Sequence, residues 1–404
     1  MTRRSGIGTA GLAVTAAGVL ANLLAYGVPL LGARLLSAAE LSALATLLAM
    51  TAIAGVASTG LQIAVAVHRA RNGPSSVTRS AVLTVAVTAG ALAATLPVAV
   101  LLLRLPVFAT VLAGISTVGV VAAGRWLGEM QGDQRFVPLA IGLAVLAGGR
   151  YGGVIAGLAL GAGLNGALLV GAATAIAVLP VLHLLARRPG IVVAGTPLAA
   201  RAVLTAGLAT LAMLVVSYAD LLLARRFLPL DASGAYAVGT VLTKGALWAP
   251  QVVTLIALPR LARDDRRTLR IALTLVGACG VVLVAGAWVA GGLAFRLAGG
   301  TGYVEMGRYA PVFAATGAVY GLLFVLVNAQ VAAGVKWPAA PLWTAAAAFV
   351  LTAWLVLPHT VAGIAFSALG TALGALVATA VLVGLRMRAP VTAPRPEYET
   401  LSVD

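Results

Sequence analysis

Long apolar runs follow one another along almost the whole chain, and short polar connections separate them. Each run has about 20 residues or more, which is the length an α-helix needs to cross a bilayer. This pattern predicts about twelve transmembrane helices, near residues 7–33, 40–67, 80–103, 107–127, 137–160, 163–186, 201–225, 233–258, 269–295, 307–333, 338–357 and 360–385. The division at 161–166 is the least marked. The expected fold class is an all-α membrane protein.

The composition supports the same fold class. Hydrophobic residues make up 61% of the 404 residues and charged residues only 9%, whereas soluble domains carry about 25% charged residues. The many Gly and Ala residues fit closely packed membrane helices, although a GC-rich genome would give a similar composition. Arg3 and Arg4 precede an apolar run that is too long for a cleaved signal, so a retained first helix is expected.

The net charge of +16 would suggest a nucleic-acid partner in a soluble protein. Here 19 of the 27 Lys and Arg residues fall on one side of the predicted helices, if the N-terminus lies inside. Loops on the cytoplasmic side carry such an excess. We therefore expect a multi-pass protein with both termini in the cytoplasm and no nucleic-acid partner. The opposite side holds Arg34, Arg104, Arg225, Arg226, Arg296 and Arg308.

A repeat is visible at a fixed offset of 191 residues. It pairs Arg34 with Arg225, and Ser42 with Ser233. It also pairs Glu40 with Asp231, and Arg69 with Arg260. Each half would contain six helices in the same orientation, as in parallel transporter repeats. We expect an N-terminal lobe at 1–190, a C-terminal lobe at 191–388 and a disordered cytoplasmic tail at 389–404.

Several stretches resemble a known family. LLGARLLSAAELSALATLLAM (30–50), GEMQGDQRFVPLA (128–140) and YADLLLARRFLPLDASGAYAVGTVL (218–242) are similar to segments of polysaccharide (O-antigen-type) flippases. These belong to the multidrug/oligosaccharidyl-lipid/polysaccharide exporter superfamily. The second of the three stretches resembles the family's loop between helices four and five. Asp220 stands where that family usually has an acidic residue.

The resemblance implies two six-helix lobes around a central cavity. It also implies a bacterial cytoplasmic membrane protein that flips a lipid-linked oligosaccharide, usually on undecaprenyl pyrophosphate, as the lobes rock. Membrane lipids, a polysaccharide polymerase and glycosyltransferases would be its partners.

Two charges inside predicted spans are the main site candidates. Lys244 lies near the middle of the eighth helix and Arg150 near the middle of the fifth. Intramembrane charges usually face a cavity or a partner. Two cations facing one cavity would attract a pyrophosphate or an acidic sugar, and Arg adds bidentate geometry. Alternatively, Arg150 ends a shorter helix at an interfacial turn.

Further candidate site residues follow from their places in the predicted helices. Asp220 is expected to couple transport to an ion, or else to form a structural ion pair. Arg34 and Arg225 are candidates for ligand binding or gating, although such arginines often snorkel to the interface. Gln62 and Gln251 could bind sugar hydroxyls or a neighbouring helix. No catalytic residue, metal site or cofactor is expected, because histidines are far apart and outer loops are short.

Three functions follow as hypotheses. The first is a flippase for a lipid-linked glycan. The second is a cation-coupled drug or small-molecule antiporter of the same fold, whose cavity should be acidic or neutral. The third is a polytopic glycosyltransferase or glycan polymerase, which would present catalytic loops outside the membrane. A scaffold that has lost transport is a further alternative.

Overall fold

The computed structural model describes residues 3–73, 77–187, 198, 200–261, 266–332, 335, 337–356 and 358–388. Every regular element in this part of the chain is a helix. The first half forms α1 (Arg3–Leu35), α2 (Ala38–Ala54), α3 (Val56–Asn72), α4 (Thr78–Leu102), α5 (Val107–Gly132), α6 (Phe136–Ala147), the π-helical turn η1 (Gly148–Gly152), α7 (Gly153–Ala159), α8 (Gly163–Ala177) and α9 (Leu179–Ala186). The expected lobe boundary at 190/191 and the expected tail at 389–404 lie outside the described residues.

The second half forms α10 (Ala200–Phe227), α11 (Leu230–Leu261), α12 (Arg266–Gly299), the 3-10 helix η2 (Thr301–Tyr309), α13 (Ala310–Ala332), α14 (Ala340–Leu355) and α15 (Val361–Arg388). Ten segments of the described chain are long and apolar enough to cross a membrane. Some of these join consecutive elements, such as α2 with α3, and α6 through η1 with α7. The 32-residue α11 and the 16-residue α14 complete twelve crossings in the described chain.

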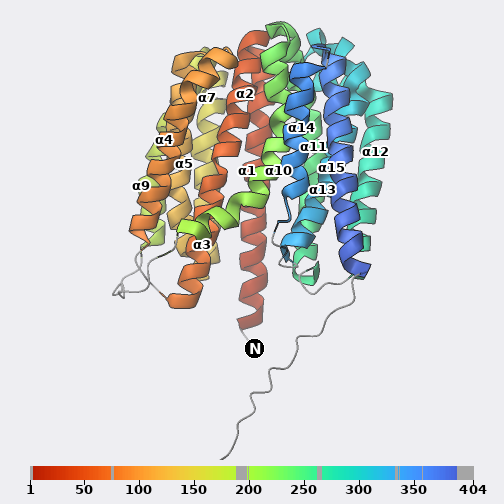
Figure 1. Cartoon of the computed structure of the whole chain (residues 1–404). Helices are drawn as coiled ribbons and strands as arrows, with labels where there is room; N and C mark the ends of the chain where they lie inside the picture. The colour runs from red at the N-terminus through yellow and green to blue at the C-terminus, as the bar shows by residue number, and fades with distance from the viewer. Residues whose placement is uncertain are drawn as a thin grey trace, which may run out of the picture.

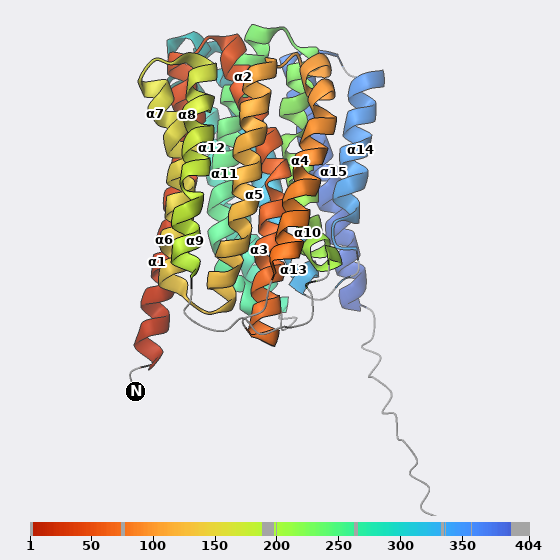
Figure 2. The same cartoon turned by 90° about the vertical axis from the view of Figure 1, so that its left-hand side faces the viewer.

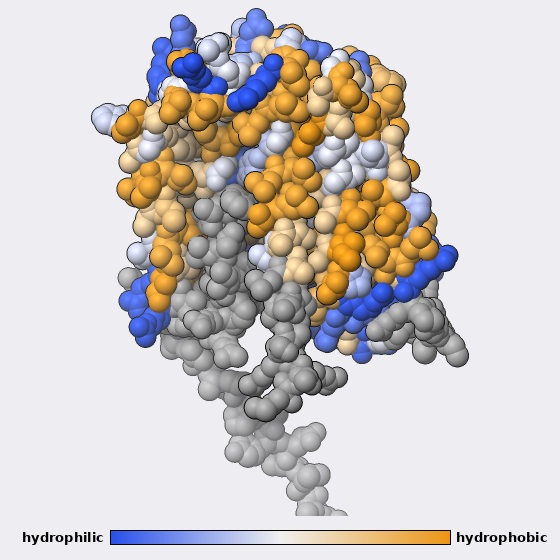
Figure 3. All heavy atoms as spheres, turned by 180° about the vertical axis from the view of Figure 1, so that it is seen from behind, coloured by the Kyte–Doolittle hydropathy of each residue, from blue (hydrophilic) through white to orange (hydrophobic). Residues whose placement is uncertain are grey.

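The outer surface agrees with a membrane-spanning bundle. Figure 3 shows a broad band of apolar side chains around the middle of the molecule, with hydrophilic patches near its two ends. Many large apolar side chains of the long helices are exposed, among them Val87 and Leu101 of α4 and Val289 of α12. Exposure of such side chains to water would be unfavourable, whereas contact with lipid is not. The all-α membrane fold predicted from the sequence is confirmed.

The two halves of the chain lie side by side. In Figure 1 the helices α4, α5, α7 and α9 stand on one side, and α11 to α15 stand on the other, with α1, α2 and α10 near the middle. Helix α1 begins at the same face of the bundle at which α15 ends, as Figure 2 also shows. We call this the near face, and the opposite one the far face.

A hydroxyl contact joins the two halves at the far face. The Oγ atoms of Ser42 in α2 and Ser233 in α11 are 2.6 Å apart, and both side chains are buried. These are the two serines that the offset of 191 pairs. Under two-fold pseudo-symmetry, equivalent residues touch each other only beside the axis. The contact therefore supports the repeat and puts its axis between α2 and α11.

Helices α3 and α5 pack closely through a glycine ladder. A Cβ atom added to Gly124, Gly128 or Gly132 would lie 2.6–2.7 Å from a backbone oxygen of α3. Small residues four apart permit such an approach. Arg69 of α3 adds ion pairs at 3.2 Å to Glu129 and to Asp133.

This packing corrects one predicted boundary. The sequence pattern predicts a helix end near residue 127, and the stretch 128–140 resembles the family's loop between helices four and five. The structure continues α5 to Gly132 and leaves only residues 133–135 between α5 and α6. The polar side chains at the end of α5 contact α3. This partner allows a polar stretch to be helical.

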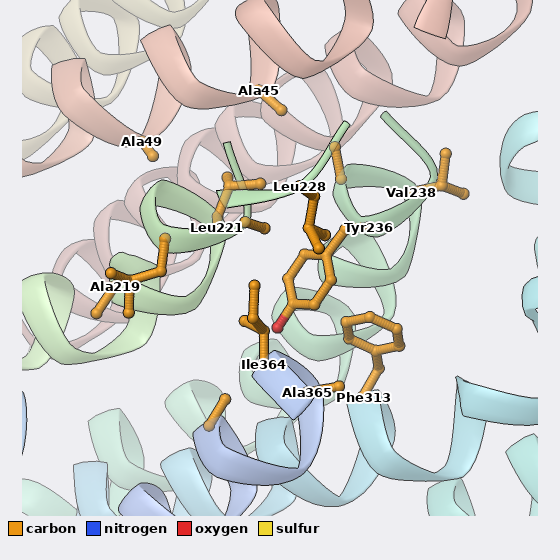
Figure 4. Packing of buried hydrophobic residues seen from close by; sticks show 14 of the residues in the cluster. Ala45, Ala49, Ala219, Leu221, Leu228, Tyr236, Val238, Phe313, Ile364 and Ala365 are labelled. Carbon is orange, nitrogen blue, oxygen red and sulfur yellow. The ribbon is translucent and has the colours of Figure 1, made fainter. Parts of the chain in front are cut away.

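The largest buried cluster crosses between the halves. Figure 4 shows Ala45 and Ala49 of α2 facing Leu221 of α10, with Tyr236 of α11 and Phe313 of α13 beneath. The rings of Tyr236 and Phe313 meet edge to face, with centroids 5.0 Å apart. Small alanines on α2 let the second half pack closely against it.

Candidate functional site

A hollow of about 240 Å³ lies where the two halves meet. Its walls come from α1, α2, η1, α10 and α11, so both halves contribute. We call it the interlobe chamber. Its polar lining consists of Asn22, Tyr26, Tyr151, Tyr218, Thr240 and Lys244. No carboxylate is among the described residues that line it.

Lys244 is the one cation among the described residues that line the interlobe chamber. Its Nζ donates a hydrogen bond to the carbonyl oxygen of Ser217 and lies 3.6 Å from the centroid of the Tyr218 ring. The hydroxyl of Tyr26 in α1 donates to the backbone oxygen of Lys244 at 2.7 Å. A ring face and a carbonyl attract an ammonium group, but neither supplies a full negative charge. In the described chain Lys244 takes part in none of the ion pairs within 4.0 Å.

Arg150 lies beside the chamber rather than in its lining. It belongs to η1, in the interior of the span formed by α6, η1 and α7. Its Nη2 donates to Thr51 Oγ1 at 3.1 Å, and its guanidinium lies 4.9 Å from the Tyr151 ring centroid. It lines a separate hollow of about 20 Å³, which we call the Arg150 cavity.

The expectation that both cations line one chamber therefore holds only for Lys244. Tyr151 lines both hollows. The alternative of an interfacial turn at Arg150 does not match the structure either, because helix continues on both sides. Instead, Gly149 and Gly153 permit close packing on α8, and Thr174 of α8 donates to the Gly149 oxygen across that contact.

Asp220 is buried in α10, behind the chamber wall. Its carboxylate accepts hydrogen bonds from the Leu221 N–H at 2.8 Å and the Tyr236 hydroxyl at 3.1 Å. The charge of Lys244 acts on it, but among the described residues Asp220 is in none of the ion pairs within 4.0 Å. Its neighbours Tyr218 and Leu221 line the chamber, so Asp220 is one layer away from it.

Arg34 and Arg225 lie at the far face and not in the chamber. Arg225 is buried, and its guanidinium donates to the carbonyl oxygens of Leu103, Arg104 and Ala39 in the first half. The exposed Arg34 donates to the Leu297 oxygen in the second half at 2.8 Å. Each arginine thus binds backbone oxygens of the opposite half.

The remaining candidates are Gln62 and Gln251. Gln62 Nε2 donates to Gln131 Oε1 at 2.8 Å, between α3 and α5 and away from the chamber. Its partner is a neighbouring helix, as the alternative interpretation expected. The side chain of Gln251 lies outside the described residues.

Sequence reasoning missed the aromatic part of the site. Tyr26, Tyr151 and Tyr218 line the chamber together with Lys244, and Tyr26 and Tyr218 contact Lys244. The available signal was their position in the middle of apolar runs, where tyrosine is less common than at the ends of membrane helices. Among the described residues, no group of three or more His, Cys, Asp or Glu side chains could hold a metal ion.

No protein-family model matches the chain, and no curated protein matches it. Solved structures do match over most of its length. The lipid II flippase MurJ in an inward closed conformation has a TM-score of 0.66 at 10% identity, over 92% of this chain and 87% of MurJ. A eukaryotic MATE transporter has a TM-score of 0.64 at 14% identity, over 94% and 93%.

A multidrug resistance MATE transporter of the MOP superfamily, in an inward-facing conformation, has a TM-score of 0.61 at 15% identity, over 91% of this chain and 94% of its own. At such low identity the likeness concerns the fold alone. All three neighbours are transporters or flippases. The chain is therefore a multi-pass membrane protein with the fold that MurJ shares with the MATE transporters.

Proposed function

We propose that this protein flips a lipid-linked, anionic oligosaccharide across a bacterial cytoplasmic membrane. The diphosphate of a polyprenyl carrier would bind beside Lys244 in the interlobe chamber. The observation that carries the proposal is the charge of this chamber, where a lysine is present and no carboxylate is among the described lining residues. Attraction between opposite charges is far stronger in such surroundings than in water.

The neutral groups of the chamber suit a glycan. Asn22, Thr240 and three tyrosines offer amide and hydroxyl groups. Sugar hydroxyls form hydrogen bonds with such groups, and sugar rings pack on aromatic faces. Translocation of this kind makes and breaks no covalent bond, so it needs no catalytic residue. A polysaccharide polymerase and glycosyltransferases would act on the same lipid-linked substrate before or after it.

Alternating access accounts for the far-face contacts. The bonds of Arg225 and Arg34 and the Ser42–Ser233 contact join the two halves at the far face. In the proposed cycle these contacts would close the chamber on that side. We expect them to break when the lobes rock, so that the headgroup leaves on that side. With both termini in the cytoplasm, the far face would be the outer one.

The competing function is a cation-coupled drug antiporter, because MATE transporters share the fold. A cationic drug would be repelled by Lys244, and this favours the glycan. The decisive experiment uses proteoliposomes that contain the purified protein. We expect an undecaprenyl-diphosphate-linked disaccharide to become accessible to a lectin on the opposite side. Ethidium transport without glycan transport would favour the antiporter instead.

Asp220 is the proposed coupling residue. A buried carboxylate with two donors and no ion pair in the described chain can take up a proton or a sodium ion when the lobes move. Asp220→Asn removes the charge and keeps the shape and the acceptor for the Leu221 N–H. The NH2 group that replaces the second oxygen can donate to the Tyr236 hydroxyl oxygen, so this contact is kept with its direction reversed. We expect it to abolish gradient-driven accumulation while lipid binding stays within about twofold. Transport that responds to the gradient as in the wild type would assign Asp220 a structural role.

A further inference from the structure

Three hollows with shared wall residues lead from the interface of the two halves into the first half of the chain. Beyond the interlobe chamber and the Arg150 cavity lies a larger hollow of about 340 Å³, bounded by α2, α4, α5 and α8. We call it the apolar groove. The chamber and the Arg150 cavity share Leu48 and Tyr151 as wall residues. The Arg150 cavity and the apolar groove share Leu47, Thr51 and Ala113.

The lining of the apolar groove suits hydrocarbon and not sugar. Its only polar side chains among the described residues are Thr51, Thr95 and Thr110. Each hydroxyl donates to a backbone oxygen of its own chain a turn earlier, at 2.8–3.1 Å. The hydroxyls are therefore satisfied, and the groove offers no donor that a glycan would need.

The groove opens toward the bilayer. Val111, Ile115 and Ile176 line it, and they are 39%, 45% and 40% exposed. A chain that lies in the groove can therefore continue into the surrounding lipid without crossing a polar surface. The ordered walls of α2, α4 and α5 would hold its inner part.

A positive charge stands at the inner end of the groove. Arg150 donates to Thr51, which lines both the groove and the Arg150 cavity. In the described chain Arg150 takes part in no ion pair. A half-buried guanidinium with no counter-ion in the described chain is available to bind an anion. A ligand with an anionic head and a long apolar chain satisfies both the charge and the groove.

We propose that the apolar groove holds the isoprenoid chain of the lipid whose diphosphate lies in the interlobe chamber. Arg150 and Tyr151 then stand where the head joins the chain. This inference rests on the proposed function. An ordinary phospholipid fits less well, because its phosphate stays at the membrane surface whereas Arg150 lies in the interior of its span. Only a lipid whose head is drawn into the protein brings its charge to Arg150.

Gly114 offers a way to fill the groove without disturbing the fold. It lines the groove, and a Cβ atom added to it meets nothing within 4 Å. Gly114→Trp should therefore occupy the space of the chain. Gly90 of α4 is a matched control, since it is exposed, equally free of neighbours and outside the groove lining. Gly90→Trp adds the same ring to the lipid-facing surface.

The test uses an undecaprenyl diphosphate that carries a photoreactive diazirine in its chain, bound to the full-length protein in phosphatidylcholine nanodiscs. Cross-linked peptides are identified by mass spectrometry. We expect the label on α4 and α5 in the wild type and in Gly90→Trp. Gly114→Trp should lose this label. It should also bind the lipid at least about tenfold more weakly, because the methylene groups of the chain lose their apolar contacts with the groove.

The outcomes separate the two proposals. If the wild type does not retain the lipid, the proposed function fails. If the lipid binds but its label is spread over the lipid-facing surface, or persists in Gly114→Trp, the groove is not the chain site. Displacement of the label by excess phosphatidylglycerol would assign the groove to ordinary acyl chains and overturn the inference. Equal melting temperatures of the two tryptophan variants exclude misfolding as the cause of the loss.

Discussion

Oxidation of a Ser42→Cys/Ser233→Cys double variant should reduce transport to the background level, and reduction should restore it. The two hydroxyls are 2.6 Å apart at the far face, so cysteines in their place lie within the reach of a disulfide. The bond would join α2 to α11 beside the pseudo-symmetry axis and keep the far face closed. The native Cys279 is exposed and is replaced by Ala in this background.

The controls isolate the cross-link from the substitutions. Each single-cysteine variant should transport normally under oxidising conditions, because Ser→Cys removes only one buried hydroxyl contact. Intact-protein mass measured after thiol labelling gives the fraction cross-linked. Full transport by a sample that is completely cross-linked would show that the far face does not open, and alternating access through this seam would then be wrong.

Charge reversal at Lys244 should have the second large effect. Lys244→Glu replaces attraction by repulsion inside the interlobe chamber. A pair of unit charges 4 Å apart interacts with about 4 kcal/mol at an effective dielectric constant of 20, so we expect transport to fall more than about a hundredfold. Delivery of the glycan to the outer face is measured in cells, with protein levels followed by immunoblot. Lys244→Arg keeps the charge and should retain most of the activity.

Arg150 provides a graded comparison. Arg150→Ala and Lys244→Ala should both impair delivery without loss of protein. The effect of Arg150→Ala should be smaller, because Arg150 does not line the chamber. Wild-type delivery by the Lys244→Ala/Arg150→Ala double variant would rule out recognition of an anion by these residues.

The fold was predictable because its signal is repeated along the chain. An apolar run long enough to span a bilayer identifies a membrane helix. The basic loops predict that the N- and C-termini lie on the same side of the membrane. The repeat could be found because Ser42 and Ser233 are polar in otherwise apolar sequence. The end of α5 was not predictable in this way, because the close packing of Gly128 on Gln62 depends on a partner helix 60 or so residues away.

The site was predictable only in part, for a geometric reason. A charge within an apolar run identifies Lys244 and Arg150, but not the direction of either side chain. That direction depends on the rotation of each helix and, at Arg150, on a π-helical turn. The position of the tyrosines within apolar runs was a signal, but it does not distinguish a tyrosine that lines a chamber from one that packs in a core. The backbone partners of Arg225 could not be foreseen either. They are carbonyl oxygens in the α4–α5 loop and in the first turn of α2, and a carbonyl oxygen has no signature in the sequence.

Binding of undecaprenyl diphosphate compared with undecaprenol tests the account most directly. The two lipids share one chain and differ in the anionic head. For the purified wild type in phosphatidylcholine nanodiscs, we predict that the diphosphate binds at least about tenfold more tightly, and that Lys244→Ala removes this preference. Equal binding of both lipids, or an unchanged preference in Lys244→Ala, would contradict an anion site in the interlobe chamber.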